Sequence, residues 1–304
     1  FKDTRYKAGL QPEYIAQPQV GVGQSNNFGQ QLFGGTTIVL GDLLGNRQLA
    51  ISAGVNGQIS DAQVFVGYTN LSRRLQYTTG VSQIPIYFLG SQPQARDEGG
   101  GFFSITDGLQ RQTWRDGFWR ALYPLDRFTR IEMGARVTNI GTSIVPIRTL
   151  YDPSGFPIEV FRERTRRLSS ATMAAPSFAL VRDNALFGYT APIMGQRFRL
   201  QVEPQIGTWQ WVDMLLDYRR YDPILFNFLT FSTRAFATIT AGRDEYQWNK
   251  YIGRPDFIRG YNRQPYADGC GAPPAGSTNA DIEANCGLAQ LFGSRLAVLN
   301  AELR

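Results

Sequence analysis

Hydrophobic and polar residues alternate along many segments of this chain, so that every second side chain is apolar. One run carries Leu, Ile, Ala and Val at alternate positions from Leu49 to Val55, with mostly polar or small residues between them. Further runs with this spacing occupy 129–138, 197–203, 211–219 and 231–240. A period of two residues places alternate side chains on opposite faces of a β-sheet. The pattern therefore predicts an all-β protein whose strands have one apolar face and one polar face.

Turn residues divide the alternating pattern into twelve predicted strands. These strands are 9–24, 35–44, 47–57, 61–71, 74–89, 111–123, 127–139, 171–190, 196–207, 210–221, 228–243 and 289–304. Many of them run to about 9–14 residues, whereas strands of globular proteins usually have about 5–6. Residues 1–304 contain no recognisable linker, so we expect a single β-sheet domain.

The links between these strands alternate in length. The links after the even-numbered strands are short: 45–46, 72–73, 124–126, 191–195 and 222–227. The three longest links, near 90–110, 140–170 and 244–288, all follow odd-numbered strands. Outer-membrane β-barrels have short periplasmic turns on one rim and long extracellular loops on the other. A soluble β-sandwich is the alternative fold, but it has no reason to separate short links from long ones.

Aromatic residues and charges support the barrel. Aromatic side chains gather near the ends of predicted strands, as in the interfacial girdles of membrane barrels; they are Trp119, Tyr123, Trp209, Trp211, Tyr218 and Tyr221. Charges of both signs recur on the polar faces, which suits a hydrated lumen. The sequence thus predicts a transmembrane antiparallel up-and-down β-barrel with its apolar faces towards lipid.

Composition narrows the choice further. Charged residues make up only 18% of the chain, yet its longest apolar stretches, such as Ile224–Phe231, are interrupted by polar residues. They fall short of the about 18 apolar residues that a spanning helix requires. Backbone groups in lipid must be satisfied internally, so a closed barrel is the alternative to helices. The net charge is +6, but the basic residues form no periodic stripe, and we expect no nucleic-acid partner.

Histidine is absent from the sequence, which excludes Ser-His-Asp and Cys-His catalysis and histidine metal sites. We therefore expect no enzymatic activity, no cofactor and no metal. The two cysteines, Cys270 and Cys286, lie in a loop rich in Gly, Pro, Ala and Asn. Their spacing without histidine does not suit zinc. An oxidising compartment favours a disulfide between them over two free thiols.

The most specific motif lies in the longest link and is followed by a charged strand. The motif is Phe257, Ile258, Arg259, Gly260 and Tyr261, and the downstream segment is Leu299-Asn-Ala-Glu-Leu-Arg304. These residues resemble the BamA-type bacterial surface-antigen barrel superfamily, whose sixth extracellular loop carries a hydrophobic-Arg-Gly-aromatic signature. Arg259 follows the eleventh predicted strand, so the strand count places it in the sixth loop on the rim that carries the long loops. The segments at 35–37 and 41–45 are similar to the subgroup whose barrel follows a TolB-like β-propeller.

The resemblance implies that the sixth loop folds back into the lumen and that Arg259 pairs with an acidic side chain of the wall. An internal charge needs such a partner, and the candidates are Glu302, Asp217 and Asp213. The family barrel has about sixteen strands, whereas this sequence has twelve. We therefore expect a segment of a longer protein that lacks its C-terminal strands.

The sequence leaves three functions open, all in the outer membrane of a Gram-negative bacterium. The first is a BamA-type membrane anchor or a component of protein insertion or translocation. The second is a diffusive porin-like pore, and the third is a surface scaffold that does not transport. Lipid is an expected partner, and other outer-membrane or periplasmic proteins are possible ones. The Arg259 motif favours the first function over the second, because a plugged lumen makes a poor open pore.

Overall fold

The computed structural model describes residues 9–25, 29–57, 59–89, 93–189, 191–225, 229–258 and 291–304. In these residues it contains β-strands and two short 3-10 helices. No helix in this described part is both long and apolar enough to cross a membrane. The described residues form two compact units, Phe1–Ala121 with Gly134–Ala174 (unit 1) and Leu122–Met133 with Ala175–Arg304 (unit 2).

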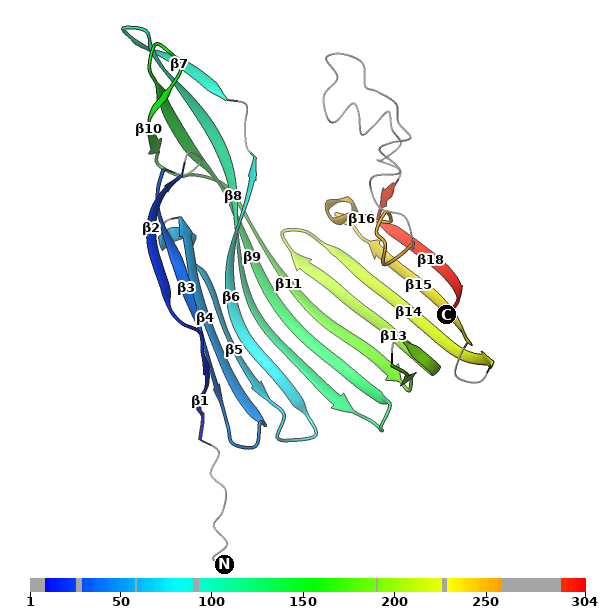
Figure 1. The fold of residues 1–304 in the computed structure, drawn as a ribbon. Helices are drawn as coiled ribbons and strands as arrows, with labels where there is room; N and C mark the ends of the chain where they lie inside the picture. Colours follow the sequence, from blue (N-terminus) through cyan, green and yellow to red (C-terminus); the bar gives the residue numbers. More distant parts are fainter. Residues whose placement is uncertain are drawn as a thin grey trace, which may run out of the picture. The chain divides into compact units, whose positions relative to one another are not determined.

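The strands follow one another along the chain as an antiparallel meander (Figure 1). The first elements are β1 (Gln11–Ile15), β2 (Gln19–Ser25), β3 (Gly29–Gly41), β4 (Arg47–Gly57), η1 (Ile59–Asp61), β5 (Gln63–Asn70), β6 (Gln76–Leu89) and β7 (Gln94–Gly99). Three long strands, β8 (Phe102–Pro124), β9 (Thr129–Tyr151) and β11 (Arg166–Asp183), contribute residues to both units, and β10 (Pro157–Arg162) precedes β11. The last elements are β12 (Leu186–Phe187), β13 (Pro192–Gly207), β14 (Trp211–Leu225), β15 (Leu229–Ala241), η2 (Glu245–Trp248), β16 (Lys250–Tyr251), β17 (Phe292–Gly293) and β18 (Arg295–Leu303).

The hydrogen-bonded order is β1-β3-β4-β5-β6-β8-β9-β11-β13-β14-β15-β18. Each strand of this path lies beside its neighbour in sequence, and β2, β7, β10 and β12 pair laterally with β3, β8, β9 and β13. The predicted all-β class and the antiparallel up-and-down order are confirmed, and the path has the predicted twelve strands.

Two predicted loops were wrong. Residues near 90–110 and 140–170 were expected to be loops, but β8 begins at Phe102 and β9 continues to Tyr151. Two further short strands, β7 and β10, pair with them (Figure 1). The β7–β8 turn is made by three consecutive glycines with positive φ, Gly99, Gly100 and Gly101. Glycine adopts this conformation without steric cost. This glycine run therefore forms a tight hairpin turn within the region predicted as a loop.

The first predicted strand was also revised. Residues 9–24 form two strands, β1 and β2, that both pair with β3. The interruption at 16–18 includes Pro18, which has no amide hydrogen to donate to a sheet. The backbone amide of Ala16 still donates to the carbonyl of Thr37 at 2.8 Å, so β3 has partners on both sides of the break.

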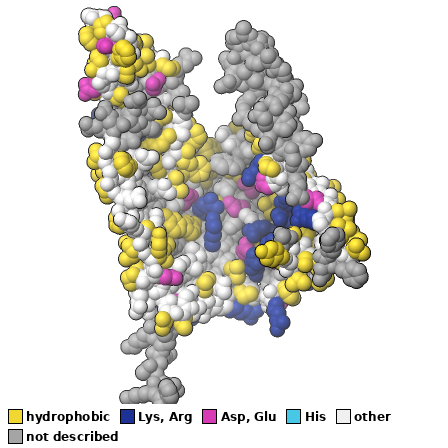
Figure 2. All heavy atoms as spheres, in the orientation of Figure 1, with side chains coloured by type: hydrophobic (Ala, Val, Ile, Leu, Met, Phe, Trp, Pro, Cys, Tyr) yellow, Lys and Arg dark blue, Asp and Glu magenta, His cyan; other side chains and the backbone are white. Residues whose placement is uncertain are grey.

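The two faces of the sheet differ as the alternation predicts. In unit 2, the apolar face carries Leu200, Met214 and Leu299, all of them exposed. The opposite face carries Arg199 and Asp217, which lie directly across from each other on β13 and β14. Figure 2 shows basic and acidic side chains gathered together on unit 2. We call these the apolar face and the polar face.

Two of the six aromatic residues predicted to form a girdle do not point to the apolar face. Trp211 and Tyr221 are buried on the polar-face side of β14. The indole Nε1 of Trp211 donates to Asp213 at 2.7 Å, two residues along the same face. Trp119 is exposed, as a girdle residue should be. Proximity to a strand end therefore did not decide on which face an aromatic side chain lies.

Aspartates close two of the short turns. Asp42 accepts the backbone amide of Arg47 at 2.8 Å after β3. Asp126 accepts the backbone amides of Phe128 and Thr129 at 2.7 and 2.8 Å between β8 and β9. These amide donors, Phe128 first, lower the pKa of Asp126. Short polar side chains that bond to nearby amides are typical of tight turns.

Candidate functional site

The polar face of unit 2 is built by β13, β14, β15 and β18. The register aligns Arg199 with Asp217 across β13 and β14, and Asp217 with Phe236 across β14 and β15. The next pairing places Arg234 opposite Asn300. Because partners in an antiparallel sheet point to the same side, these side chains lie on one continuous surface.

Asp217 is the centre of this surface. Its carboxylate binds Arg219 at 2.6 Å and Arg234 at 3.1 Å. Arg219 is two residues away on the same strand, whereas Arg234 reaches over from β15. A carboxylate between two guanidinium groups accepts several charge-assisted hydrogen bonds, which are stronger than neutral ones. The group therefore ties β14 to β15 and fixes the orientation of Arg234.

The segment that follows β16 is docked on this surface. Arg234 donates through Nη1 to the backbone carbonyl of Asp256 at 2.8 Å, and Asn300 donates to the carbonyl of Phe257 at 3.0 Å. The ring of Phe257 lies 5.0 Å from that of Phe236. Two polar side chains of the wall therefore hold the backbone of residues 256–257.

Apolar packing supports the same contact. Phe257 and Ile252 pack against a buried cluster made by Phe236, Leu296 and Val298. Burying apolar side chains contributes about 25 cal/mol for each Å² removed from water. The docked segment is thus held by a small hydrophobic core as well as by hydrogen bonds.

A third attachment lies at the start of the segment. Lys250 binds Asp213 at 2.7 Å, and the same carboxylate oxygen accepts the hydroxyl of Thr240 at 2.5 Å. Asp213 therefore links β14, β15 and β16. The segment 250–258 is anchored at both of its ends.

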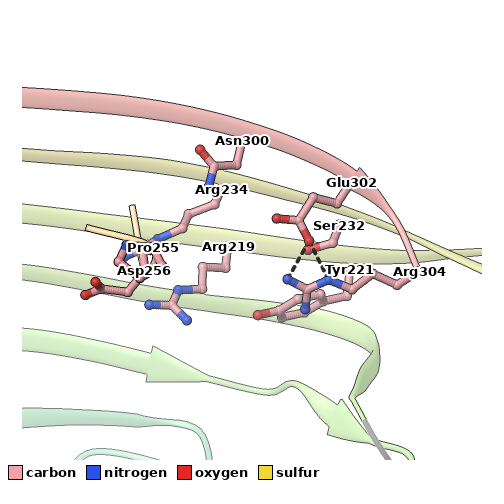
Figure 3. A pocket seen from close by; sticks show the side chains of 9 residues that line it. All are labelled: Arg219, Tyr221, Ser232, Arg234, Pro255, Asp256, Asn300, Glu302 and Arg304. Atoms are coloured by element: carbon pink, nitrogen blue, oxygen red, sulfur yellow. Dashed lines mark hydrogen bonds and ion pairs between the residues drawn. The ribbon is translucent and has the colours of Figure 1, made fainter. Parts of the chain in front are cut away.

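A pocket of about 230 Å³ opens beside the docked segment (Figure 3). Its lining mixes both charges: Arg219, Tyr221, Ser232, Arg234, Pro255, Asp256, Asn300, Glu302 and Arg304. Glu302 pairs with Arg304 at 2.8 Å on one side of it. Among the described residues, no group of three or more His, Cys, Asp and Glu side chains could hold a metal ion.

One ion pair of the polar face reaches across an intervening strand. Glu132 of β9 binds Arg199 of β13 at 2.8 Å, although β11 lies between these strands in the sheet. The side chains of β11 beneath the bridge must be small. Ala179 of β11 is almost fully buried, while the neighbouring Phe178 is exposed on the opposite face.

Unit 1 has its own group of one carboxylate and two arginines. Asp61, in η1, binds Arg111 of β8, and it binds Arg162 of β10 at 2.8 Å. The Asp61 side chain is fully buried and that of Arg162 is 6% exposed. This group attaches the β10 hairpin to the link between β4 and β5.

The structure places part of the predicted site. Phe257 and Ile258 belong to the docked segment, and the Ile258 amide donates to the carbonyl of Arg254 at 3.1 Å. The other motif residues, Arg259, Gly260 and Tyr261, and the cysteines Cys270 and Cys286 lie outside the described residues. The three candidate acids all have basic partners: Asp217 pairs with Arg219 and Arg234 of the wall, Asp213 with Lys250 of the docked segment, and Glu302 with Arg304 at the end of β18.

Sequence reasoning missed Arg234, Lys250 and Asn300, which hold the docked segment. Arg234 and Asn300 carried a usable signal, since both fall on the polar face of the alternating pattern. Their contact with residues 256–257 depends on the path of the chain after β15, which strand periodicity does not specify. Lys250 lies in a two-residue strand that has no periodic signature.

No protein-family model matches this chain, and no curated protein matches it. A search of solved structures finds a likeness to the crystal structure of BamA from Haemophilus ducreyi lacking POTRA domains 1-3. The two chains are 13% identical, with a TM-score of 0.45, over 81% of this chain and 51% of that one. This chain therefore spans about half the length of the BamA chain that it resembles.

Proposed function

We propose that this chain forms part of the wall of a β-barrel in a bacterial outer membrane, with the apolar face towards lipid and the polar face towards the lumen. The observation that carries the proposal is the sorting of side chains in unit 2. Leu200, Met214 and Leu299 are exposed on one face, while the ion pairs of Asp217 and Glu132 lie on the other. Contiguous exposed apolar surface on a sheet is typical of a membrane contact.

The docked segment 250–258 favours a partly filled lumen. It occupies the polar face over β14, β15 and β18 through Lys250, Arg234 and Asn300. A wide diffusive pore needs that face open to water. Within the proposed barrel, the role as membrane anchor or component of protein insertion or translocation therefore ranks above the porin-like role.

Cysteine labelling tests the membrane orientation. We expect a cysteine at Leu200 to be protected from a membrane-impermeant maleimide in proteoliposomes, and a cysteine at Gln205 to be labelled. Both variants are made in a background with Cys270→Ser and Cys286→Ser. The reverse pattern, with labelling at Leu200 and protection at Gln205, would reject the proposed orientation.

Conductance in planar bilayers tests the filled lumen. Arg234→Gln with Asn300→Ala removes both bonds to residues 256–257, and we expect larger and more frequent channel openings than in the unchanged protein. Arg243→Gln is the matched control, because Arg243 is largely exposed and binds Asp244 after the end of β15. Large, steady openings of the unchanged protein would instead support the porin-like pore.

The roles proposed for Arg259 and the cysteines extend the same picture. Arg259 continues directly from the docked segment, and we propose that it adds a further attachment of the loop to the wall. Arg259→Ala should then lower the heat resistance of the folded protein on a gel and expose residues 262–288 to protease. A Cys270–Cys286 disulfide should appear in mass spectra of a digest made without reduction, and two free thiols would reject it.

A further inference from the structure

A row of polar side chains crosses the face of unit 1 that carries Val64, Val66 and Val81, which we call the apolar face of this unit. Gln83 of β6 lies opposite Val64, and the same face carries Val66 paired with Val81. Arg115 of β8 lies on this face too, since its Nε donates to Gln83 Oε1 at 2.9 Å. Phe118, at the opposite parity of β8, stacks on Phe65 on the other face. An arginine on an apolar sheet face requires an explanation, because charge facing lipid is costly.

The acceptor from Gln83 is held in place. Its Nε2 donates to the backbone carbonyl of Ala62 at 3.0 Å, which turns its oxygen towards Arg115. Neither group carries a negative charge. Gln83 therefore orients the guanidinium of Arg115 without neutralising its charge.

Asn139 of β9 also orients the Arg115 guanidinium, through a second acceptor oxygen. Its oxygen accepts Arg115 Nη1 at 3.4 Å, and its Nδ2 donates to Ser170 at 3.0 Å and to Thr172 at 2.8 Å. The amide thus points its oxygen at Arg115 because β11 takes up its donors. In the described part of the chain, Arg115 donates hydrogen bonds only to neutral groups.

The positive charge of Arg115 is consequently uncompensated. A guanidinium has five N–H donors, of which these bonds use two. Among the described residues, Arg115 takes part in no ion pair, and it is exposed. The remaining N–H groups of Arg115 donate to no described residue.

Arg115 lies at one limit of the apolar band. Trp119, four residues along β8 towards the turn at 125–128, is on the same face and exposed, and Tyr123 lies four residues further. Eight residues span about 26 Å along a strand, and a strand tilted as in membrane barrels covers most of the about 25 Å apolar band over this length. On β9, the exposed Val137 lies two residues from Asn139 and therefore on the same face. Gln83, Arg115 and Asn139 therefore lie where the apolar band meets the membrane surface.

We propose that Arg115, oriented by Gln83 and Asn139, binds the phosphate of an anionic lipid headgroup at the surface of the membrane. This inference rests on the proposed function, because it requires the apolar face to contact lipid. A planar guanidinium suits phosphate oxygens, which it can bind through two N–H groups. A lipid phosphate supplies the missing negative charge while its acyl chains cover the adjacent apolar surface.

Lipid binding to the full chain in neutral detergent micelles tests the site by native mass spectrometry. The probes are phosphatidic acid and phosphatidylcholine. We expect Arg115→Gln to weaken phosphatidic acid binding about tenfold, the loss of roughly one charge-assisted contact. Arg115→Lys should weaken binding less, and Asn139→Leu should weaken it about threefold because Arg115 loses its orientation.

Arg120→Gln is the matched control. Arg120 is exposed on the same strand at the opposite parity, where it lies 5.7 Å from the Phe118 ring, and the substitution removes the same charge. Equal affinities of Arg115→Gln and Arg120→Gln, with both proteins folded by their heat resistance on a gel, would overturn the site. Competition by inorganic phosphate at the lipid concentration would overturn the assignment to a lipid headgroup.

A spin label at Val137→Cys separates this inference from the proposed function. In bilayers, the label should be accessible to oxygen and shielded from a water-soluble nickel complex. A shielded label with no effect of Arg115→Gln would reject the headgroup site alone. A label open to the nickel complex would reject the lipid-facing apolar face and the site with it.

Discussion

Unit 1 and unit 2 each place one aspartate between two arginines, but in different surroundings. Asp61 is fully buried and its partners Arg111 and Arg162 are 50 and 101 residues away in sequence. The Asp217 side chain is 15% exposed, and its partners Arg219 and Arg234 come from its own strand and the next one. The same set of charges thus attaches a distant hairpin in unit 1 and stabilises adjacent strands in unit 2.

Since both groups have the same number of ion pairs, we expect burial to decide what each group contributes to stability. Removing one partner of a buried ion pair leaves a desolvated charge and is strongly destabilising. Water can solvate an exposed partner and screens the pair. A single type of change, carboxylate to amide, can therefore measure the effect along a series of increasing exposure.

Asp61→Asn should have the largest effect. It leaves Arg111 and Arg162 without their carboxylate in a buried environment, which typically costs about 3–5 kcal/mol of folding free energy. Urea unfolding in micelles, followed by tryptophan fluorescence, measures the loss. Joint replacement of the three residues by apolar ones of similar size should recover much of it. If Asp61→Asn cost no more than Glu132→Gln, the comparison between units would fail.

Asp217→Asn should have an intermediate effect. Arg219 and Arg234 lose charge-assisted hydrogen bonds at a partly exposed site, so we expect a cost of about 1–3 kcal/mol. Arg234 also loses the group that orients it towards Asp256, and limited proteolysis should therefore cut residues 252–258 faster. Unchanged proteolysis with lowered stability would show that Arg234 holds the segment without help from Asp217.

Glu132→Gln should have a small effect. Its side chain is 26% exposed and that of Arg199 is 36% exposed, and pairs in such surroundings contribute about 0–1 kcal/mol. A steric change beneath the Glu132–Arg199 pair should have a larger effect. Ala179→Leu should destabilise unit 2 more than Glu132→Gln, because a larger side chain on β11 collides with groups packed above it. The same urea measurement compares the two variants.

Asp126→Asn should have the smallest effect, and the effect should depend on pH. The amides of the turn lower the pKa of Asp126 in the folded protein. A lowered pKa gives stability that is present above the unfolded value of about 3.9 and is lost as the pH falls through the folded value. The urea midpoints of the two proteins should thus differ at neutral pH and converge in acid. A constant difference would mean that the carboxylate charge is not involved.

The sequence predicted the parts of the fold that depend on a two-residue period. The strand path, the antiparallel order and the polar positions of Asp213, Asp217 and Glu302 follow from alternation alone. The outer parts of β8 and β9 did not, because apolar and polar residues do not alternate regularly there. The predicted loops near 90–110 and 140–170 are therefore largely strand in the structure.

The candidate site was less accessible to sequence reasoning. The acids were identified, but their basic partners were not, because Arg234 and Lys250 meet them through strand register and through the fold of residues 242–252. Register depends on turn geometry and on packing of the whole face. Trp211 and Tyr221 were misplaced for a related reason, since they can satisfy their polar atoms on the charged face as readily as at a membrane surface.

The long reach of the Arg162–Asp61 pair has a consequence for how the chain acquires its structure. Contacts between neighbouring strands of a meander close short loops, whereas this pair closes 101 residues. We expect it to form after β5, β6, β8 and β9 have assembled, so that it contributes little to the transition state for folding. Substitutions at Asp61 should accordingly accelerate unfolding and leave the folding rate nearly unchanged. The pair would form late in folding and would then slow the unfolding of a sheet that assembles strand by strand.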